Sequence, residues 1–406
     1  MTDGQPRYPD GFRSQAGREF APAGATTDRG ELALVLTGGG ARGAYQVGML
    51  RYLARAYPDL NIPILSGVSA GAINTALLAQ HHGTFLQAVT ELAGLWSELM
   101  PERIFRVDVR SLAANLGRWG IRLTSGGFGE SHARGLVDTE PLRGFLEEAL
   151  APVNGELTGI DYNLHRGTLK ATSISTTDYN TGQSVVWVQG RDIETWERPG
   201  RTSRSCRLTV DHIMASAALP LFFPAVQIGP HWYGDGGIKL TAPLSPALHL
   251  GARRILAVST RYDRTRDEAN SVDVRGYPPP AQVIGQLMDA IFLEMVDQDV
   301  ARMERINRIV QKVPPEHRDG MRPVELMVMR PSRDLAKLAA DYEPRLPRAF
   351  RLMTRGLGTR QTSSPDVLSM IMFQDDYAKR LMALGEEDAE RRGEELDHFL
   401  RDDQGS

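Results

Sequence analysis

The order strand, glycine-rich turn, helix occurs twice within residues 32–79, and this repetition limits what the chain can fold into. Residues 32–36 form a short apolar run of strand length, and apolar residues recur at helical spacing over residues 44–56. The second unit runs from the apolar residues 62–65 into the helix-prone residues 72–79. Because successive units of this kind are typical of parallel strands joined by crossover helices, the sequence predicts an α/β fold with a mainly parallel sheet.

The rest of the chain contains further elements of both kinds. Strand-like apolar runs are found at residues 169–175, 184–188, 226–228, 255–259 and 325–329. Helices are predicted at residues 85–100, 138–149, 210–218 and 281–310. Since a single core rarely grows beyond about 250 to 300 residues, we expect one large domain with appended elements in this chain of 406 residues.

The second glycine turn carries a serine, in the sequence Gly67-Val68-Ser69-Ala70-Gly71. Small neighbours at a sharp bend from strand to helix allow the backbone to expose a serine hydroxyl. The positive end of the following helix favours negative charge near that oxygen. The five-residue pattern alone occurs by chance in many proteins, so its place between a strand and a helix is what makes Ser69 a candidate nucleophile.

The first glycine turn reads Gly38-Gly39-Gly40-Ala41-Arg42-Gly43 and also fits the dinucleotide-binding pattern. A dinucleotide site needs an acidic residue at the end of the second strand, whereas Asp59 precedes that strand. An oxyanion hole is the other use for such a loop, with backbone N–H groups converging on one oxygen and Arg42 adding positive charge nearby. A glycine turn that serves only tight packing is the third interpretation.

A serine nucleophile needs a base, and Asp235 is the candidate. It lies in the sequence Tyr233-Gly234-Asp235-Gly236-Gly237, just after the strand-like residues 226–228. Glycines on both sides would allow an aspartate to project from a tight turn into a cleft. Taken alone, a sequence of this kind is more often simply a good turn without chemistry.

The three motifs in this order resemble the patatin-like phospholipase family. That family has a glycine-rich oxyanion loop, a serine motif about 30 residues later and an Asp-Gly-Gly or Asp-Gly-Ala sequence near the end of the domain. Residues 215–224, with Pro220 and the pair Phe223-Pro224, and residues 135–142 also resemble family segments. The specific resemblance covers about residues 32–259.

The resemblance implies a three-layer α/β/α domain and a lipid acyl hydrolase, of the phospholipase A or esterase type, that uses a catalytic dyad. It implies Ser69 as nucleophile, Asp235 as base, and backbone amides near Gly39, Gly40 and Arg42 as oxyanion donors. We expect a disordered leader at residues 1–30, a catalytic domain at 31–260 and a mostly helical extension at 261–406 packed on the domain. Within the domain, residues 101–135 are either a mobile cap or an ordinary surface excursion.

Two alternatives stay open at this point. An α/β-hydrolase esterase would use a Ser-Asp-His triad, with His231 or His249 as the histidine. A catalytically silent lipid-binding or regulatory protein would carry the same motifs without turnover. An activated serine should react rapidly with a fluorophosphonate probe, and this reaction distinguishes an enzyme from a silent protein.

Charge, histidine spacing and cysteine count limit which ligands and partners the chain is expected to bind. The net charge of −3 and the interspersed charges give no field that favours nucleic acid, so we expect no nucleic-acid partner and, at any lipid surface, mainly apolar or local contact. The resemblance implies a lipid or ester substrate, and we expect transient contact with a membrane surface. The histidines lack metal-ligand spacing, and Cys206 is the only cysteine, so we expect no metal, no cofactor and no internal disulfide. Without a signal peptide or a transmembrane segment, a cytoplasmic location is expected.

Overall fold

The computed structural model describes residues 31–106, 135–265, 268, 280–292, 294–346, 351 and 366–401. The expected leader at residues 1–30 and most of the expected cap, residues 107–134, lie outside the described residues. The part of the expected cap at residues 101–106 contains the short helix α4 (Pro101–Ile104). The division into three parts therefore stays a prediction.

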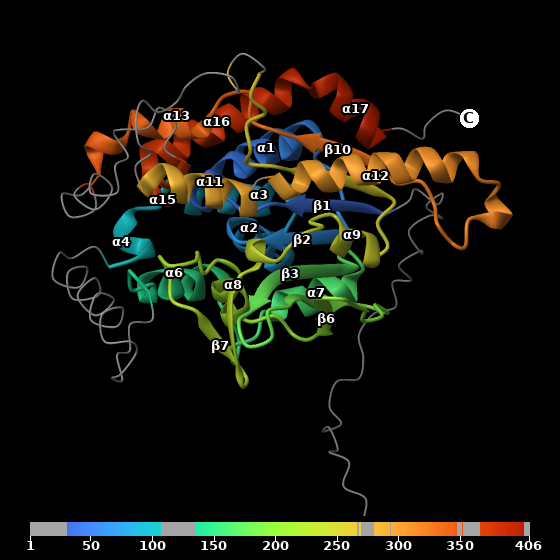
Figure 1. Cartoon of the computed structure of the whole chain (residues 1–406), viewed down its shortest axis with the longest axis horizontal. Coiled ribbons are helices and arrows are strands. Elements are labelled where there is room, and N and C mark those ends of the chain that lie inside the picture. The colour runs from blue at the N-terminus through green and yellow to red at the C-terminus, as the bar shows by residue number, and fades with distance from the viewer. Residues whose placement is uncertain are drawn as a thin grey trace, which may run out of the picture. The chain divides into compact units, whose positions relative to one another are not determined.

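The fold is built on a ten-stranded mixed sheet whose centre is parallel (Figure 1). Its main path runs in the order β10-β9-β1-β2-β3-β4-β6-β5, and β7 pairs with β8, which joins β3. The pairs from β10 to β3 are all parallel. The strands are β1 (Leu32–Leu36), β2 (Ile64–Val68), β3 (Ala171–Asp178), β4 (Ser184–Gly190), β5 (Glu197–Arg198), β6 (Arg201–Ser205), β7 (Val226–Ile228), β8 (His231–Asp235), β9 (Arg254–Val258) and β10 (Glu325–Met329).

Helices cover both faces of this sheet. In the amino-terminal two thirds they are α1 (Gly43–Ala56), α2 (Ala70–Gln80), α3 (Phe85–Ser97), α6 (Glu140–Leu150), α7 (Thr158–Arg166), α8 (Val210–Ser216) and α9 (Ser245–His249). Further along they are α11 (Pro280–Phe292), α12 (Glu294–Lys312), α13 (Leu335–Ala340), α15 (Asp366–Ile371), α16 (Asp375–Arg391) and α17 (Gly393–Arg401). Short 3-10 turns are η1 (Gly40–Arg42), η2 (Gly236–Ile238), η3 (Pro315–His317) and η4 (Glu343–Arg345).

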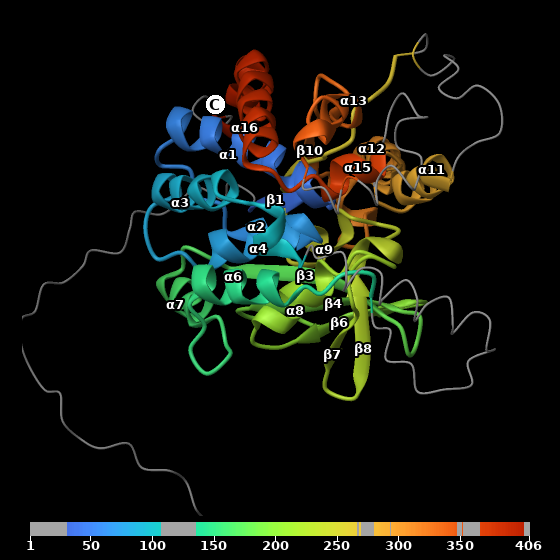
Figure 2. The ribbon, with the colours of Figure 1, turned by 90° about the vertical axis from the view of Figure 1, so that its left-hand side faces the viewer.

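The alternation of side chains along β1 shows how the layers are separated. Leu32, Leu34 and Leu36 pack into the larger core together with α1, α2 and α3. Ala33 and Val35 point to the opposite face, where they join a smaller core with α9 and α12. In Figure 2, α1 and α3 lie to the left of β1 and β10, and α12 lies to their right. A parallel strand buried on both faces reads as a continuous apolar run, which is why the central strands are recognisable in the sequence.

The carboxyl-terminal residues are part of this architecture. Strand β10 extends the sheet beside β9 in parallel register, with Leu326 opposite Ile255. Helix α16 packs closely on α1, because a Cβ added at Gly48 would lie 1.9 Å from the carbonyl oxygen of Met382. The single helix expected at residues 281–310 is two helices, α11 and α12. None of the helices that the structure describes is long and apolar enough to cross a membrane.

Candidate active site

Ser69 lies at the turn between β2 and α2 in a strained backbone conformation. Its φ of 57° and ψ of −127° are values that residues with a side chain rarely adopt. Helix α2 begins at the next residue, so the positive end of the helix dipole lies beside the serine. Strain of this kind is maintained only where the surrounding structure holds it, and it often marks a functional position.

The two glycines of the serine motif allow neighbouring backbone segments to approach each other closely. A Cβ added at Gly67 would lie 2.4 Å from the carbonyl oxygen of Gly71. One added at Gly71 would lie 2.1 Å from the carbonyl oxygen of Leu36, at the end of β1. Both distances are far below van der Waals contact, so any side chain there would displace the turn that carries Ser69.

Strand β3 brings Asp235 to the serine turn. In the parallel register Val68 of β2 lies opposite Ser175, and in the antiparallel register Asp235 of β8 lies opposite Thr176. The carboxyl ends of β2 and β8 therefore flank the same point of β3. Asp235 is the last residue of a strand, whereas the sequence had placed it in a tight turn. A Cβ added at the following Gly236 would lie 2.2 Å from the carbonyl oxygen of Ser175.

The carboxylate of Asp235 is completely buried. Its Oδ1 accepts a hydrogen bond of 2.9 Å from the amide of Gly237. Its Oδ2 accepts no hydrogen bond of normal geometry from any residue that the structure describes. Burial raises the pKa of Asp235 to about 7, and the nearby Ser69 hydroxyl and the Gly237 amide counteract part of that rise. A carboxylate with this pKa is a stronger base than an exposed aspartate.

The end of helix α8 braces both candidate residues. The hydroxyl of Ser216 accepts a hydrogen bond of 3.0 Å from the amide of Ser69 and donates one of 2.7 Å to the carbonyl oxygen of Ser175. Two residues further on, the carbonyl oxygen of Ala218 accepts from the amide of Asp235 at 3.2 Å. The sequence marked residues 215–224 only as resembling a family segment and did not single out Ser216, whose signal was the run of small residues Ala215-Ser216-Ala217-Ala218.

The glycine loop follows β1 and lies at the same edge of the sheet. Gly39 has a φ of 146° and Gly40 a φ of 57°, so both adopt conformations that favour glycine. Thr260, just after β9, donates a hydrogen bond of 2.7 Å from its hydroxyl to the carbonyl oxygen of Gly38. Among the described residues, the amides of Gly39 and Gly40 donate to no other group. These two amides are therefore available to a ligand.

The side chain of Arg42 is directed toward α15, whereas the sequence predicted that its positive charge would lie near the oxyanion. Its amide donates to the carbonyl oxygen of Gly39 at 3.2 Å, within the 3-10 turn. Its side chain is 3% exposed and forms an ion pair with Asp366 and a hydrogen bond with Ser369, both from α15.

The last glycine of the loop, Gly43, begins α1, and a Cβ there would lie 2.9 Å from both Ala70 and Trp96.

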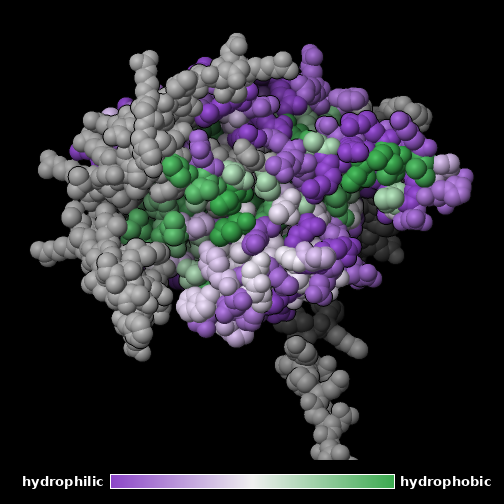
Figure 3. All heavy atoms as spheres, in the orientation of Figure 1, coloured by the Kyte–Doolittle hydropathy of each residue, from purple (hydrophilic) through white to green (hydrophobic). Residues whose placement is uncertain are grey.

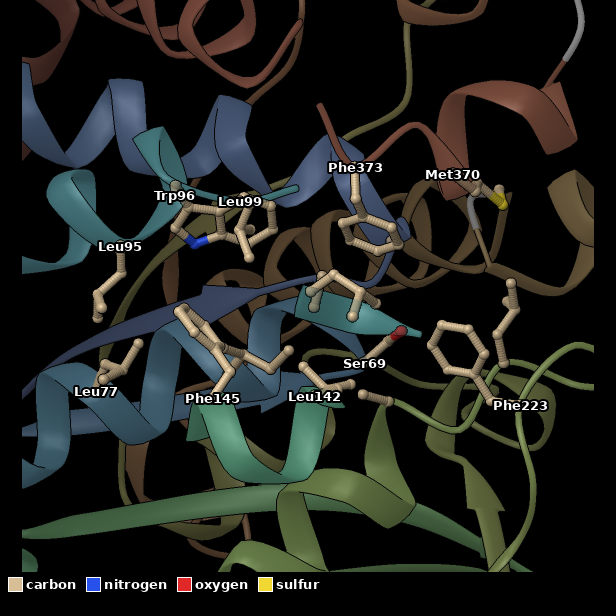
Figure 4. Close-up of a pocket in the computed structure, with 16 residues that line it drawn as sticks. Ser69, Leu77, Leu95, Trp96, Leu99, Leu142, Phe145, Phe223, Met370 and Phe373 are labelled. Atoms are coloured by element: carbon tan, nitrogen blue, oxygen red, sulfur yellow. The ribbon is translucent and has the colours of Figure 1, made fainter. Parts of the chain in front are cut away.

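An apolar pocket extends from Ser69 into the larger core (Figure 4). It encloses about 610 Å³ of unfilled space, including its open mouth. Its apolar lining comes from α2 and α3 (Ile73, Leu77, Leu95, Trp96), from α6 (Leu142, Phe145), from residues 217–223 (Ala217, Leu219, Phe223) and from the carboxyl-terminal part (Met370, Phe373). Figure 4 shows Ser69 between Phe223 and Met370 on one side and Leu77 and Leu95, at the far end of the pocket, on the other.

A comparison with protein families identifies the fold. Residues 34–248 match the family model described as patatin-like phospholipase, which is more than half of the chain. The chain belongs to the patatin-like phospholipase family. This match includes all three motifs of the candidate site and confirms the resemblance found in the sequence. No curated protein sequence matches the chain.

Several solved structures are similar to this patatin-like protein at low sequence identity. The structure of human GIVD cytosolic phospholipase A2 has a TM-score of 0.45 and 12% identity over 92% of this chain and 62% of that one. VipD from Legionella pneumophila has a TM-score of 0.35 and 13% identity, over 89% and 66%. The type III effector protein ExoU has a TM-score of 0.34 and 15% identity, over 90% and 53%. The chain thus spans 53% to 66% of the length of these three.

The histidines considered for a triad are engaged elsewhere in this patatin-like domain. His231 contacts Asp178 through its Nδ1 at 2.7 Å, at the opposite end of β8 from Asp235. His249 stacks on Trp196 with ring centroids 4.4 Å apart. Burial, together with two neighbouring arginines, lowers the pKa of His249. Within the part of the chain that the structure describes, no histidine hydrogen-bonds Asp235.

Neither a dinucleotide nor a metal has a matching set of residues in the described part of this patatin-like chain. Asp59 lies before β2, at the opposite end of the strand from the carboxyl ends where the glycine loop and Ser69 lie. Among the described residues, no group of three His, Cys, Asp or Glu side chains could hold a metal ion. Burial raises the pKa of the Cys206 thiol to about 12, so this cysteine is a poor nucleophile.

Proposed function

We propose that this patatin-like protein is a lipid acyl hydrolase that cleaves carboxylic esters with Ser69 as nucleophile and Asp235 as base. One observation carries the proposal: a serine on a strained turn, next to a buried carboxylate of raised pKa, lines an apolar pocket. The serine and the carboxylate provide the chemistry, and the pocket provides a place for an acyl chain. The family membership supports the same assignment.

In the first half of the reaction, Ser69 Oγ attacks the ester carbonyl carbon and Asp235 accepts the proton that the hydroxyl loses. The carbonyl oxygen becomes an oxyanion, which we place against the free amides of Gly39 and Gly40. The tetrahedral intermediate then collapses. The bond to the leaving alcohol breaks, Asp235 returns the proton to the alcohol oxygen, and an acyl-enzyme remains.

In the second half, water attacks the acyl-enzyme and Asp235 accepts a proton from the water. Collapse of the second intermediate releases the carboxylic acid, and the proton returns to Ser69 Oγ. Because Asp235 must be ionised to act, its pKa of about 7 allows it to act near neutral pH. No cofactor takes part in these steps.

The pocket supports an acyl chain as the group bound inside the protein. Ile73 and Leu77 follow Ser69 by four and eight residues, so they lie along one face of α2. At 1.5 Å per residue, Leu77 lies about 12 Å along the helix from the serine. We propose that this distance sets the acyl length that fits, and that Leu77→Trp shifts the preference to shorter chains.

Two experiments test the proposed function. The wild-type protein should react rapidly with a fluorophosphonate probe and hydrolyse phospholipids or p-nitrophenyl esters of graded chain length. Ser69→Ala should abolish both without changing the circular dichroism spectrum. Residual turnover above about a thousandth of the wild-type rate, with the fold unchanged, would contradict Ser69 as nucleophile. A wild-type protein that binds lipid but neither labels nor hydrolyses would support the silent lipid-binding alternative.

An exposed apolar area on α11 and the cysteine content bear on where the protein acts. We propose transient contact with a lipid surface, because Val283 and Leu287 of α11 are 47% and 56% exposed, and Figure 3 shows a hydrophobic area there. We also propose a cytoplasmic location, since a single cysteine is compatible with a reducing compartment.

A further inference from the structure

The side chain of Arg42 connects the glycine loop to a helix more than three hundred residues away. Its Nη2 donates to Asp366 Oδ1 at 2.6 Å and lies 3.4 Å from the carbonyl oxygen of Asp366. Its Nε donates to Ser369 Oγ at 2.7 Å. The guanidinium therefore donates hydrogen bonds from Nε and Nη2 to two residues of one short helix, α15. The side chains of Arg42 and Asp366 are only 3% and 14% exposed.

The acceptors on α15 are themselves held in place. The hydroxyl of Ser369 accepts from Arg42 and donates to the carbonyl oxygen of Asp366 at 2.7 Å. Hydrogen bonds thus join these three residues across η1 and α15. A guanidinium matches this arrangement because its donors are fixed in one plane, whereas a lysine ammonium presents a single point charge.

The same helix contacts the loop at a second point. A Cβ added at Gly40 would lie 2.1 Å from the carbonyl oxygen of Met370, so the backbone of α15 lies directly against the loop. Met370 and Phe373 also line the apolar pocket. The carboxyl-terminal segment therefore forms one wall of the pocket and supports the residues whose amides face the proposed oxyanion.

This geometry points to a role for Arg42 other than electrostatic stabilisation. Its charge is neutralised by Asp366 at hydrogen-bond distance, and its amide is already bonded to the carbonyl oxygen of Gly39. Coulombic attraction to a developing oxyanion is weakened by a carboxylate of opposite sign on the same guanidinium. What remains is a positional effect, because a buried ion pair with a hydrogen-bonded partner holds both backbones in one arrangement.

We propose that Arg42 and Asp366 are positioning residues: their ion pair clamps helix α15 onto the glycine loop and so fixes the amides of Gly39 and Gly40 for catalysis. This inference rests on the proposed function of the site. It assigns the carboxyl-terminal segment a part in the reaction, although that segment lies outside the residues that match the family model.

Kinetics distinguish a clamp from a charge donor. The clamp predicts that Asp366→Asn and Arg42→Lys each lower kcat about tenfold while KM for a short-chain ester changes less than twofold. It also predicts that the double variant is no slower than the slower single variant, because the two residues act as one unit. If Arg42 instead acted by its charge, Asp366→Asn would maintain or raise kcat by removing the counter-charge, and Arg42→Lys would retain most activity.

Asp376→Asn is the matched control. Asp376 lies on the same carboxyl-terminal segment and forms an ion pair with Arg345, but among the described residues no hydrogen bond or ion pair joins it to the glycine loop, and it does not line the pocket. Its replacement should leave kcat within twofold of the wild type. If Asp366→Asn prevents folding, Ser369→Ala removes the acceptor of Arg42 Nε and the hydrogen bond within α15, but keeps the ion pair, and tests the same clamp with an expected loss of a few-fold in kcat.

Hydrogen exchange tests the clamp without turnover. In both the wild-type and the Ser69→Ala backgrounds, Asp366→Asn should accelerate amide exchange in peptides covering residues 37–44, while Asp376→Asn should not. Unchanged exchange in those peptides together with unchanged kcat would overturn the clamp. A protein without any Ser69-dependent hydrolysis would overturn the proposed function instead, and the exchange result would still decide whether Asp366 holds the loop.

Discussion

The proposed catalytic groups and the walls of the pocket come from differently organised regions of the protein. Ser69 and the glycine loop belong to two adjacent strand–turn–helix units near the start of the described chain. The pocket, in contrast, takes its lining from α2, α3, α6, the residues after α8 and the segment around α15. The first region is defined by short motifs. The second exists only because the fold brings distant helices together.

This difference shows which constraints act on each region. The turns of the first region need glycine at positions where a Cβ would lie within about 2 to 3 Å of a neighbouring atom, so their sequences are restricted and recognisable. The pocket needs only apolar side chains of suitable size, which many sequences can supply. Asp235 lies between these cases, because a local glycine motif surrounds it but long-range strand pairing places it.

The largest expected effect concerns Asp235, and it tests whether the chemistry resides in the motifs. Asp235→Asn retains the shape of the side chain but cannot accept a proton, so kcat should fall by about a thousandfold or more. Steady-state hydrolysis of a p-nitrophenyl ester measures this loss. Circular dichroism should be unchanged.

Three control variants complete that test. Asp178→Asn removes another fully buried carboxylate near the end of β3, and His231→Ala removes the histidine that contacts it. His249→Ala removes the second triad candidate. Each should retain most of the activity. If either histidine variant lost as much activity as Asp235→Asn, a Ser-Asp-His triad would replace the dyad.

Gly40→Ala should have the next largest effect, a loss of about 100-fold or more in kcat, or about 3 to 4 kcal/mol in the barrier if one oxyanion donor is displaced. The added Cβ would lie 2.1 Å from the carbonyl oxygen of Met370, at a φ of 57° that disfavours alanine. Gly182→Ala is the control, since Gly182 has a φ of 69° but no atom within 4 Å of an added Cβ. Calorimetry with nicotinamide and flavin nucleotides tests the dinucleotide alternative, and micromolar binding with unaltered ester kinetics would refute the oxyanion role.

The raised pKa of Asp235 predicts two pH dependences. The rate constant kcat/KM should rise with pH through about 7, because only the ionised carboxylate accepts the serine proton. Asp235 holds its proton more tightly in the folded state than in the unfolded state. The free energy of unfolding of the wild type therefore decreases as the pH rises from about 4 to about 7. Asp235→Asn lacks this penalty. Its melting temperature relative to wild type should therefore be higher at pH 8 than at pH 4, and an equal difference at both values would contradict the raised pKa.

Much of the fold could be predicted from the sequence. The strands expected at residues 184–188, 226–228, 255–259 and 325–329 agree with β4, β7, β9 and β10 to within two residues, because buried strands read as apolar runs. Strand β8 was missed. Its sequence, His231 to Asp235, contains glycine and polar residues, and it forms a strand through antiparallel pairing with β3 and β7 rather than through its own pattern.

The candidate site was predictable only where it is local. Ser69, Asp235 and the glycine loop were recognisable because each needs glycine beside it. The contact of Arg42 with Asp366 was not, because no periodicity connects a loop residue with a short helix so distant in the sequence. The pocket residues Met370 and Phe373 were missed for the same reason. The burial of Arg42, which requires an acidic partner, is a property of the folded chain and could not be predicted from the loop sequence.

Ser216→Ala has the smallest expected effect, and it tests whether a residue outside the motifs contributes to the chemistry. The variant leaves the amide of Ser69 without its acceptor and should lower kcat about tenfold, since an unsatisfied buried donor costs about 1 to 3 kcal/mol. Ser203→Ala is the matched control, because Ser203 is also buried and its hydroxyl also bridges backbone groups, the amide and the carbonyl oxygen of Trp196. Both variants should lose a similar amount of stability in urea, but only Ser216→Ala should slow fluorophosphonate labelling of Ser69. Equal labelling rates in the two variants would show that the strained turn holds the nucleophile without help from α8, and the chemistry would then depend on the local motifs alone.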